Sequence, residues 1–233
     1  MFESFKDWVP TIHKEGYVFV LCFALATFVL FAISNTFGWI GVILTIWCIY
    51  FFRDPERITP VAKCLVISPA DGLIQRITRA APPKELDMVE KEMTRISIFL
   101  NVFDVHVNRI AVDGVIEKAH YHPGKFLNAS LDKASEDNER QSLLIKTPDN
   151  QNVALVQIAG LIARRIVCNA KENEQVFAGK RFGIIRFGSR VDVYLPDTAK
   201  ILVAEGQTAI GGETIVARLS GANEKEEITW ENR

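Results

Sequence analysis

The chain has 233 residues, with 27 lysines and arginines against 28 aspartates and glutamates, and its formal net charge is −1. This near balance excludes the class of proteins that bind nucleic acid through a large excess of basic residues. The length suits one sizeable domain and a smaller segment.

The four cysteines are far apart in the chain: Cys22, Cys48, Cys64 and Cys168. They form no C-x-x-C motif and no Cys/His pair at zinc-ligand spacing. We therefore expect unpaired thiols in a reducing compartment and no metal site.

Two uncharged apolar runs open the chain, Tyr17 to Ile33 and Phe37 to Phe52, with the polar turn "SNT" between them. Each run is about the shortest length that crosses a bilayer as a helix. A cleaved signal peptide would have one run and a cleavage site of small residues, so a membrane hairpin is favoured. A buried helical hairpin stays open as the alternative.

Basic residues flank both outer ends of this hairpin: Lys6 and Lys14 precede it, and Arg53, Arg57 and Lys63 follow it. The positive-inside rule then places both flanks in the cytoplasm. We expect a segment 1–52 in a membrane and a domain 53–233 on its cytoplasmic side. The basic residues after the second run would also favour an anionic leaflet.

Beyond residue 53 the pattern changes to short apolar runs bounded by glycine, proline, aspartate and asparagine, as in "CLVISPADGLIQRI" and "NVALVQIAGLIARRIVC". These runs have the length and composition of strands, and no helical stripe of similar strength is present. The sequence predicts a mostly β domain, a compact sandwich or barrel.

Two pairs of segments within this domain resemble each other: 69–77 resembles 111–119, and 174–186 resembles 206–218. The second pair has a glycine turn leading into an apolar strand, as in lipoyl-carrying domains. We therefore expect lipoyl-like hairpin repeats, with chance similarity as the alternative.

The chain contains one Gly-Ser dipeptide, Gly188-Ser189, between two apolar runs. Arg190 and Val191 follow, so the G-x-S-x-G motif of α/β-hydrolases is absent. A glycine carbonyl without a neighbouring side chain precedes a hydroxyl here, and glycine allows strained turns. The hydroxyl could attack this carbonyl, move the acyl group from nitrogen to oxygen and leave an ester that can eliminate.

Seven segments carry a resemblance that extends from about Phe51 to about Ala217: "FRDPER", "SPADG", "FLNVFDVHVNR", "YHPGKFLNA", "NER", "ARRIVC" and "FGSRVDVYLP". In this order they resemble the phosphatidylserine decarboxylase family, in its short bacterial proenzyme form. The resemblance implies self-cleavage between Gly188 and Ser189 into chains 1–188 and 189–233. Ser189 would become a pyruvoyl group, a covalent cofactor built from the chain.

The resemblance also implies roles for His106 in "FDVHV" and Asp71 in "SPADG". His106 matches the histidine that activates the serine, and Asp71 matches the carboxylate that orients it. A neutral imidazole can accept the hydroxyl proton near pH 7, and a carboxylate fixes its tautomer.

One position departs from the family pattern. Longer members carry a further histidine three positions before the His106 equivalent, whereas this chain has Phe103. The donor of the proton to the product therefore stays open between His106 and His122, with His120 the weakest candidate.

The function implied is decarboxylation of phosphatidylserine to phosphatidylethanolamine, through a Schiff base between the pyruvoyl carbonyl and the lipid amine. The partners are phosphatidylserine in the bilayer, the two processed chains and a possible homodimer, without nucleic acid. Two alternatives stay open. One is a pyruvoyl decarboxylase of another amine, and the other is a membrane-tethered lipoyl-like adaptor without enzymatic activity.

Overall fold

The computed structural model describes residues 11–127, 137–160, 165–186, 189–221 and 227–233. The chain divides into two compact units, Met1–Glu56 and Arg57–Arg233. The predicted domain boundary after residue 52 and the predicted processed chains remain predictions.

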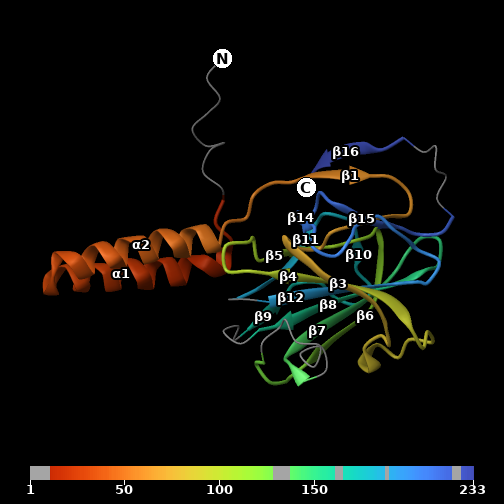
Figure 1. The fold of residues 1–233 in the computed structure, drawn as a ribbon, viewed down its shortest axis with the longest axis horizontal. Helices are drawn as coiled ribbons and strands as arrows, with labels where there is room; N and C mark the ends of the chain where they lie inside the picture. The colour runs from red at the N-terminus through yellow and green to blue at the C-terminus, as the bar shows by residue number, and fades with distance from the viewer. Residues whose placement is uncertain (1–10, 128–136, 161–164, 187–188, 222–226) are drawn as a thin grey trace, which may run out of the picture. The chain divides into compact units, whose positions relative to one another are not determined.

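The first unit contains two apolar helices, α1 (Tyr17–Ile33) and α2 (Asn35–Phe51), after a short 3₁₀ turn, η2 (Lys14–Gly16). They lie side by side, as Figure 1 shows. Only Ser34 separates them, and its hydroxyl accepts a hydrogen bond from the Thr36 N–H at 3.3 Å, as an N-cap does. The predicted three-residue turn is therefore wrong in length, because Asn35 and Thr36 already belong to α2.

Small residues let the two helices approach. A Cβ placed on Gly41 would lie 2.7 Å from the Thr27 hydroxyl oxygen, so only glycine fits there. The Thr27 and Thr45 hydroxyls are 3.0 Å apart and satisfy each other between the helices. Among the described residues, one helical stretch, Lys14–Ile33, is long and apolar enough to cross a membrane, and α2 is shorter at 17 residues.

The second unit is built from strands, as the sequence predicts. They are β1 (Ile58–Val61), β2 (Leu65–Ile67), β3 (Gly72–Ala80), β4 (Met93–Leu100), β5 (Val107–Arg109), β6 (Gly114–His122), β7 (Arg140–Lys146), β8 (Asn152–Ala159), β9 (Ile166–Cys168), β10 (Gln175–Val176), β11 (Arg181–Ile185), β12 (Ser189–Leu195), β13 (Lys200–Ile201), β14 (Thr208–Ala209), β15 (Ile215–Arg218) and β16 (Thr229–Asn232), with a 3₁₀ turn η3 (Lys84–Leu86) between β3 and β4.

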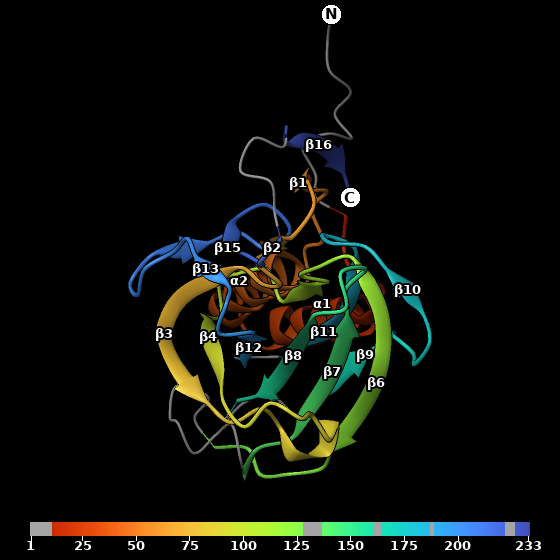
Figure 2. The ribbon, with the colours of Figure 1, turned by 90° about the vertical axis from the view of Figure 1, so that its right-hand side faces the viewer.

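The main sheet has eight strands in the order β10-β6-β7-β8-β12-β4-β3-β14, and its pairings are all antiparallel. Figure 2 shows it curling from β3 round to β6. Two three-stranded sheets, β5-β11-β9 and β13-β15-β2, and the pair β1-β16 complete the described strands. The mostly β prediction is confirmed.

Strand β12 occupies the middle of the main sheet and separates two hydrophobic layers. Alternate residues such as Val191 and Val193 point into the large core, together with Ile98 of β4 and Leu155 of β8. Tyr194, on the opposite face, packs in a second cluster with Leu86 of η3. Both faces of β12 are therefore buried, which fixes its register.

The paired sequence similarities correspond to equivalent strand pairings. Strand β3 begins opposite β14 through Gly72, and β6 begins opposite β10 through Gly114. Strands β3 and β6 each have a register shift shortly after this glycine, and so do the pairs β15-β2 and β11-β5. The unit thus contains two halves with the same pairing pattern.

The aspartate before each glycine makes the same backbone contact. Asp71 accepts a hydrogen bond from the Gly211 N–H at 2.8 Å, and Asp113 accepts one from the Ala178 N–H at 2.7 Å. Each carboxylate therefore ties a strand start to a turn of the partner hairpin. These pairings do not make the hairpins lipoyl-like, so that part of the fold prediction is not confirmed.

Candidate active site

Ser189 is the first residue of β12, and its position is set by pairing on both sides. It lies opposite Leu100, the last residue of β4, and opposite Ala159, the last residue of β8. The residue is fully buried, and its Oγ has no hydrogen-bond partner among the described residues. A buried hydroxyl without a partner costs about 1–3 kcal/mol, so this oxygen is a candidate for chemistry.

Gly188, the other residue of the predicted cleavage site, lies outside the described residues. The assignment of the cleaved bond therefore rests on Ser189 and remains a prediction. Ser189 shares the core face of β12 with Val191, because side chains two apart on a strand point the same way.

His106 immediately precedes β5 and is fully buried. Its Nδ1 lies 3.0 Å from the Asp104 carbonyl, and this contact sets the orientation of the ring. Its own carbonyl accepts a hydrogen bond from the N–H of Ile185, the last residue of β11. Only three residues separate Ile185 from Ser189, so β5 and β11 bring the histidine to the strand end that leads to the serine.

Asp71 reaches the same region through β3. Gly72, which follows it, has a φ of +147°, and a Cβ there would lie 3.3 Å from the Cα of Leu100. Leu100 lies in turn opposite Ser189. The Arg109 N–H donates to the Pro69 carbonyl at 2.8 Å, which links the segment of Asp71 to the strand after His106. All three predicted residues therefore belong to neighbouring segments of the second unit.

The other two histidines lie elsewhere. His122 ends β6 opposite Arg140 of β7, which lies opposite Ile158 of β8 and thus three strands from β12. At the usual strand spacing this is roughly 14 Å along the sheet. His120 is exposed on the same strand. Neither histidine is favoured over His106 as the proton donor.

Phe103 lies in the turn between Leu100 and His106, and it is 61% exposed. The Asn101 side chain accepts the Phe103 N–H at 2.8 Å, and the Asp104 side chain accepts the Asn101 N–H at 2.8 Å. These two contacts from side chains to the backbone shape the turn that leads to His106. Phe103 offers no proton, so the departure from the family pattern stands.

Two buried polar residues beside this region were missed from the sequence. Gln157 of β8 donates from Nε2 to Oδ1 of Asn108 of β5 at 2.8 Å, and both residues are fully buried. Gln157 Oε1 and Asn108 Nδ2 have no partner among the described residues. Gln157 lies on the same strand as Ala159, two residues away, and therefore on the face that Ser189 also lines. In the sequence, the signal for Gln157 was a single polar residue within an apolar run.

Cysteine chemistry is disfavoured next to this site. Burial is the main cause that raises the pKa of the Cys168 thiol, to about 11, with the Glu174 charge adding to it and a backbone contact to Ala170 opposing it. A thiol with this pKa stays protonated near pH 7 and is a poor nucleophile.

The part of the chain that the structure describes holds no group of three or more His, Cys, Asp or Glu residues that could bind a metal.

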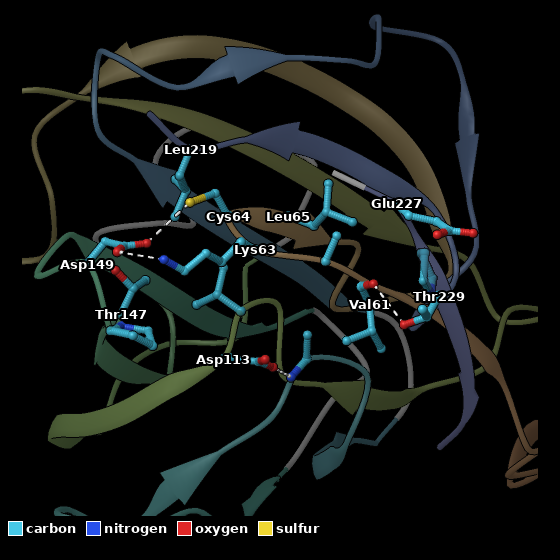
Figure 3. Close-up of a pocket in the computed structure, with 15 residues that line it drawn as sticks. Val61, Lys63, Cys64, Leu65, Asp113, Thr147, Asp149, Leu219, Glu227 and Thr229 are labelled. Atoms are coloured by element: carbon cyan, nitrogen blue, oxygen red, sulfur yellow. Dashed lines mark hydrogen bonds and ion pairs between the residues drawn. The ribbon is translucent and has the colours of Figure 1, made fainter. Parts of the chain in front are cut away.

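A cavity of about 370 Å³ is lined by Cys64 and Asp113, which occupy the places of His106 and Asp71 in the other half of the fold. Figure 3 shows Cys64 and Lys63 directed at Asp149, with Cys64 Sγ 3.4 Å from Oδ2 and Lys63 Nζ 3.6 Å from Oδ1. The Leu219 N–H donates to the Cys64 carbonyl, in the same way as the Ile185 N–H donates to the His106 carbonyl. Cys64 thus takes the place of the histidine, and the lining residues include no general base of that kind.

The family of the chain is shown by comparison with known proteins. A family model described as phosphatidylserine decarboxylase matches residues 44–217. The phosphatidylserine decarboxylase proenzymes of Rickettsia typhi and Rickettsia prowazekii are each 56% identical over 231 residues, which is 99% of this chain and 100% of each relative. The proenzyme of Rickettsia akari is 57% identical over the same shares. The chain belongs to the phosphatidylserine decarboxylase family.

Proposed function

We propose that the protein converts phosphatidylserine to phosphatidylethanolamine and carbon dioxide, after cutting itself between Gly188 and Ser189. The observation that carries this proposal is the buried Ser189 Oγ, without a hydrogen-bond partner among the described residues, at the start of the central strand. Relatives named as proenzymes agree with a chain that requires processing.

In the cutting step, the Ser189 Oγ attacks the Gly188 carbonyl carbon while His106 takes the hydroxyl proton. The amide C–N bond then breaks, and an ester to Oγ replaces it. Loss of the Ser189 Cα proton and of the Cβ–Oγ bond releases the Gly188 carboxylate. Addition of water and loss of ammonia then leave the pyruvoyl group. The contact of His106 Nδ1 with the Asp104 carbonyl leaves Nε2 to accept the proton, and Asp71 would stabilise the cationic form of the ring.

The residues present fit a pyruvoyl group at position 189. The serine lies at the start of β12, so a cut before it leaves the strand and its pairing intact. The adjacent buried amides of Asn108 and Gln157 have polar atoms without a partner among the described residues. Once formed, the group supplies a carbonyl that condenses with the substrate amine and withdraws the electron pair left by carbon dioxide.

The sheet would hold the two processed chains together. The small chain 189–233 contains β12, which pairs along its length with β4 and β8 of the large chain. It also contains β14, β15 and β16, which pair with β3, β2 and β1. A cut before Ser189 therefore removes no pairing among the described strands, and we expect the chains to stay associated.

The helical hairpin would attach the enzyme to the bilayer that contains its substrate. Its outward apolar side chains, such as Phe28 at 84% exposure and Ile43 at 65%, suit contact with lipid. We propose an inner-membrane location in a bacterial cell with the β unit on the cytoplasmic side, because basic residues flank both outer ends of the hairpin.

Intact mass and denaturing gels of the purified protein test the cutting step. Wild type should give two fragments of 188 and 45 residues, whereas Ser189→Ala should give one chain of 233 residues. Ser97→Ala is the matched control, because Ser97 is also a buried serine of this sheet without a partner for its Oγ among the described residues. A wild-type protein that stays whole under active conditions would contradict the proposal, and so would a Ser97→Ala protein that fails to cut.

A further inference from the structure

The carboxylate of Asp71 is held by two groups from distant parts of the chain. Its Oδ1 accepts the Gly211 N–H at 2.8 Å, and its Oδ2 accepts Nη2 of Arg57 at 2.8 Å. The side chains of Arg57 and Asp71 are only 15% and 17% exposed, so water screens this ion pair weakly. A carboxylate has about four acceptor positions, so these two contacts leave capacity for a third partner.

Arg57 is itself fixed by the last residue of the chain. The Arg57 N–H donates to the Arg233 carbonyl at 3.2 Å, and the Arg233 N–H donates to the Arg57 carbonyl at 2.8 Å. The same Arg233 carbonyl accepts Nη1 of Arg109, a buried residue of β5, at 2.7 Å. The backbone of Arg57 is therefore clamped, and its guanidinium is aimed at Asp71 at little further entropic cost.

Asp113 is the equivalent aspartate in the other half of the unit. Comparison with it shows which of the two contacts of Asp71 is specific to Asp71. It keeps the backbone contact, from Ala178 at 2.7 Å, but its nearest arginine contact is Nη1 of Arg233 at 3.8 Å. Its side chain is 44% exposed. Since both halves have the backbone contact, that contact serves the fold, whereas the short guanidinium contact is a property of Asp71.

We propose that Arg57 is a positioning residue for self-cleavage, which acts by holding the Asp71 carboxylate in a fixed orientation. This inference rests on the role of Asp71 in the proposed function. It also changes the interpretation of Arg57 from the sequence, where it counted as a topology signal and a contact for an anionic leaflet. A guanidinium engaged with Asp71 at 2.8 Å, and with Glu213 at 3.9 Å, already has anionic partners within the protein.

The test is the rate at which the full-length proenzyme releases the 45-residue fragment, followed on gels. We expect Arg57→Met to slow release by about tenfold or more, because it removes the charged hydrogen bond that holds the Asp71 carboxylate. Arg57→Lys, which retains the charge, should recover part of the rate. In the Asp71→Asn background, Arg57→Met should cause no further slowing, because residues that act through one group are not additive.

Two controls separate this role from a general effect on the fold. Asp113→Asn changes the equivalent aspartate, and Arg79→Met removes a 59% exposed arginine that pairs with Asp197 on the surface. Both should process at the wild-type rate. Thermal unfolding of each variant shows whether the fold is retained, and Arg57→Gln replaces Arg57→Met if the latter does not fold.

The outcomes distinguish this inference from the proposed function. If Asp71→Asn slows processing and Arg57→Met does not, the role of Arg57 is overturned and that of Asp71 stands. If Asp71→Asn processes normally, the assignment of Asp71 fails. If the effects of Asp71→Asn and Arg57→Met on the processing rate multiply in the double variant, Arg57 acts independently of Asp71 and the inference is overturned. It is also overturned if no Arg57 variant folds, because Arg57 is then a structural residue.

Discussion

Arg190 and Asp192 form a buried ion pair on one face of β12, with Nε 2.9 Å from Oδ1 and Nη2 3.0 Å from Oδ2. Their side chains are 2% and 0% exposed. Arg190 directly follows Ser189, so after the proposed cut it would become the second residue of the small chain. The pair therefore anchors the new strand end from the face opposite to the one that Ser189 lines.

Arg190→Met should destabilise the protein by about 3 kcal/mol or more, because it leaves the Asp192 carboxylate buried without its main partner. The double variant Arg190→Met/Asp192→Leu should regain much of this loss, since it removes both charges. Urea unfolding of the three proteins measures the difference. A double variant no more stable than Arg190→Met would show that the pair does not behave as a unit.

His106→Ala and Asp71→Asn should slow or abolish processing and leave the fold intact. They remove the proposed base and its orienting carboxylate, and an asparagine oxygen can still accept the Gly211 N–H. Gels report the cut, and thermal melts report the fold. His120→Ala, at an exposed position, is the control and should process normally. Unfolding of either site variant would make that residue structural.

Acid should weaken the contact between η3 and β7. Burial raises the pKa of the Glu85 carboxyl, but hydrogen bonds and charge from Arg140, with a hydrogen bond from Ser142, lower it on balance to about 2. Since the pKa in the folded state is below the unfolded value of about 4.3, this stabilisation is present above pH 5 and is lost as pH falls toward 2.

Glu85→Gln should therefore cost about 2 kcal/mol at pH 7 and little at pH 2. Chemical unfolding across pH 2–7 measures this difference. Glu92→Gln, at a 62% exposed carboxylate, is the control and should change little at any pH. An equal loss for Glu85→Gln at both ends of the range would contradict the shifted pKa.

The hairpin should place its connecting turn and its outer ends on opposite sides of the membrane. Single cysteines at Ser34 and at Glu3, in a chain without its native cysteines, should then react with an impermeant reagent from opposite sides. Equal accessibility of the two positions would favour a hairpin that lies on the membrane or outside it.

Local features of the fold could be predicted from the sequence, because they depend on neighbouring residues. The apolar run Tyr17–Ile33 coincides with α1, and the strand-rich pattern of the second unit is confirmed. The strand order could not be predicted, since β12 pairs with β4 and β8, which lie far away in the chain. Such pairing depends on the whole core and not on local propensity.

The residues of the site divide in the same way, into those that the local sequence predicts and those that depend on contacts between distant parts of the chain. Ser189, His106 and Asp71 were predicted from short segments that resemble the family, whereas Arg57 was interpreted as a membrane-flanking charge. Its contact with Asp71 joins residues 14 positions apart, and its anchor Arg233 is at the other end of the chain. The pair of Asn108 and Gln157 was missed because their contact spans 49 positions.

Reductive trapping tests the central claim most directly. The processed protein is incubated with vesicles that contain phosphatidylserine in the presence of cyanoborohydride, and the two chains are then weighed by mass spectrometry. The account predicts that the lipid-derived mass appears on the 45-residue fragment 189–233 and that turnover stops. An adduct on the 188-residue chain, or activity that depends on added pyridoxal phosphate, would contradict it.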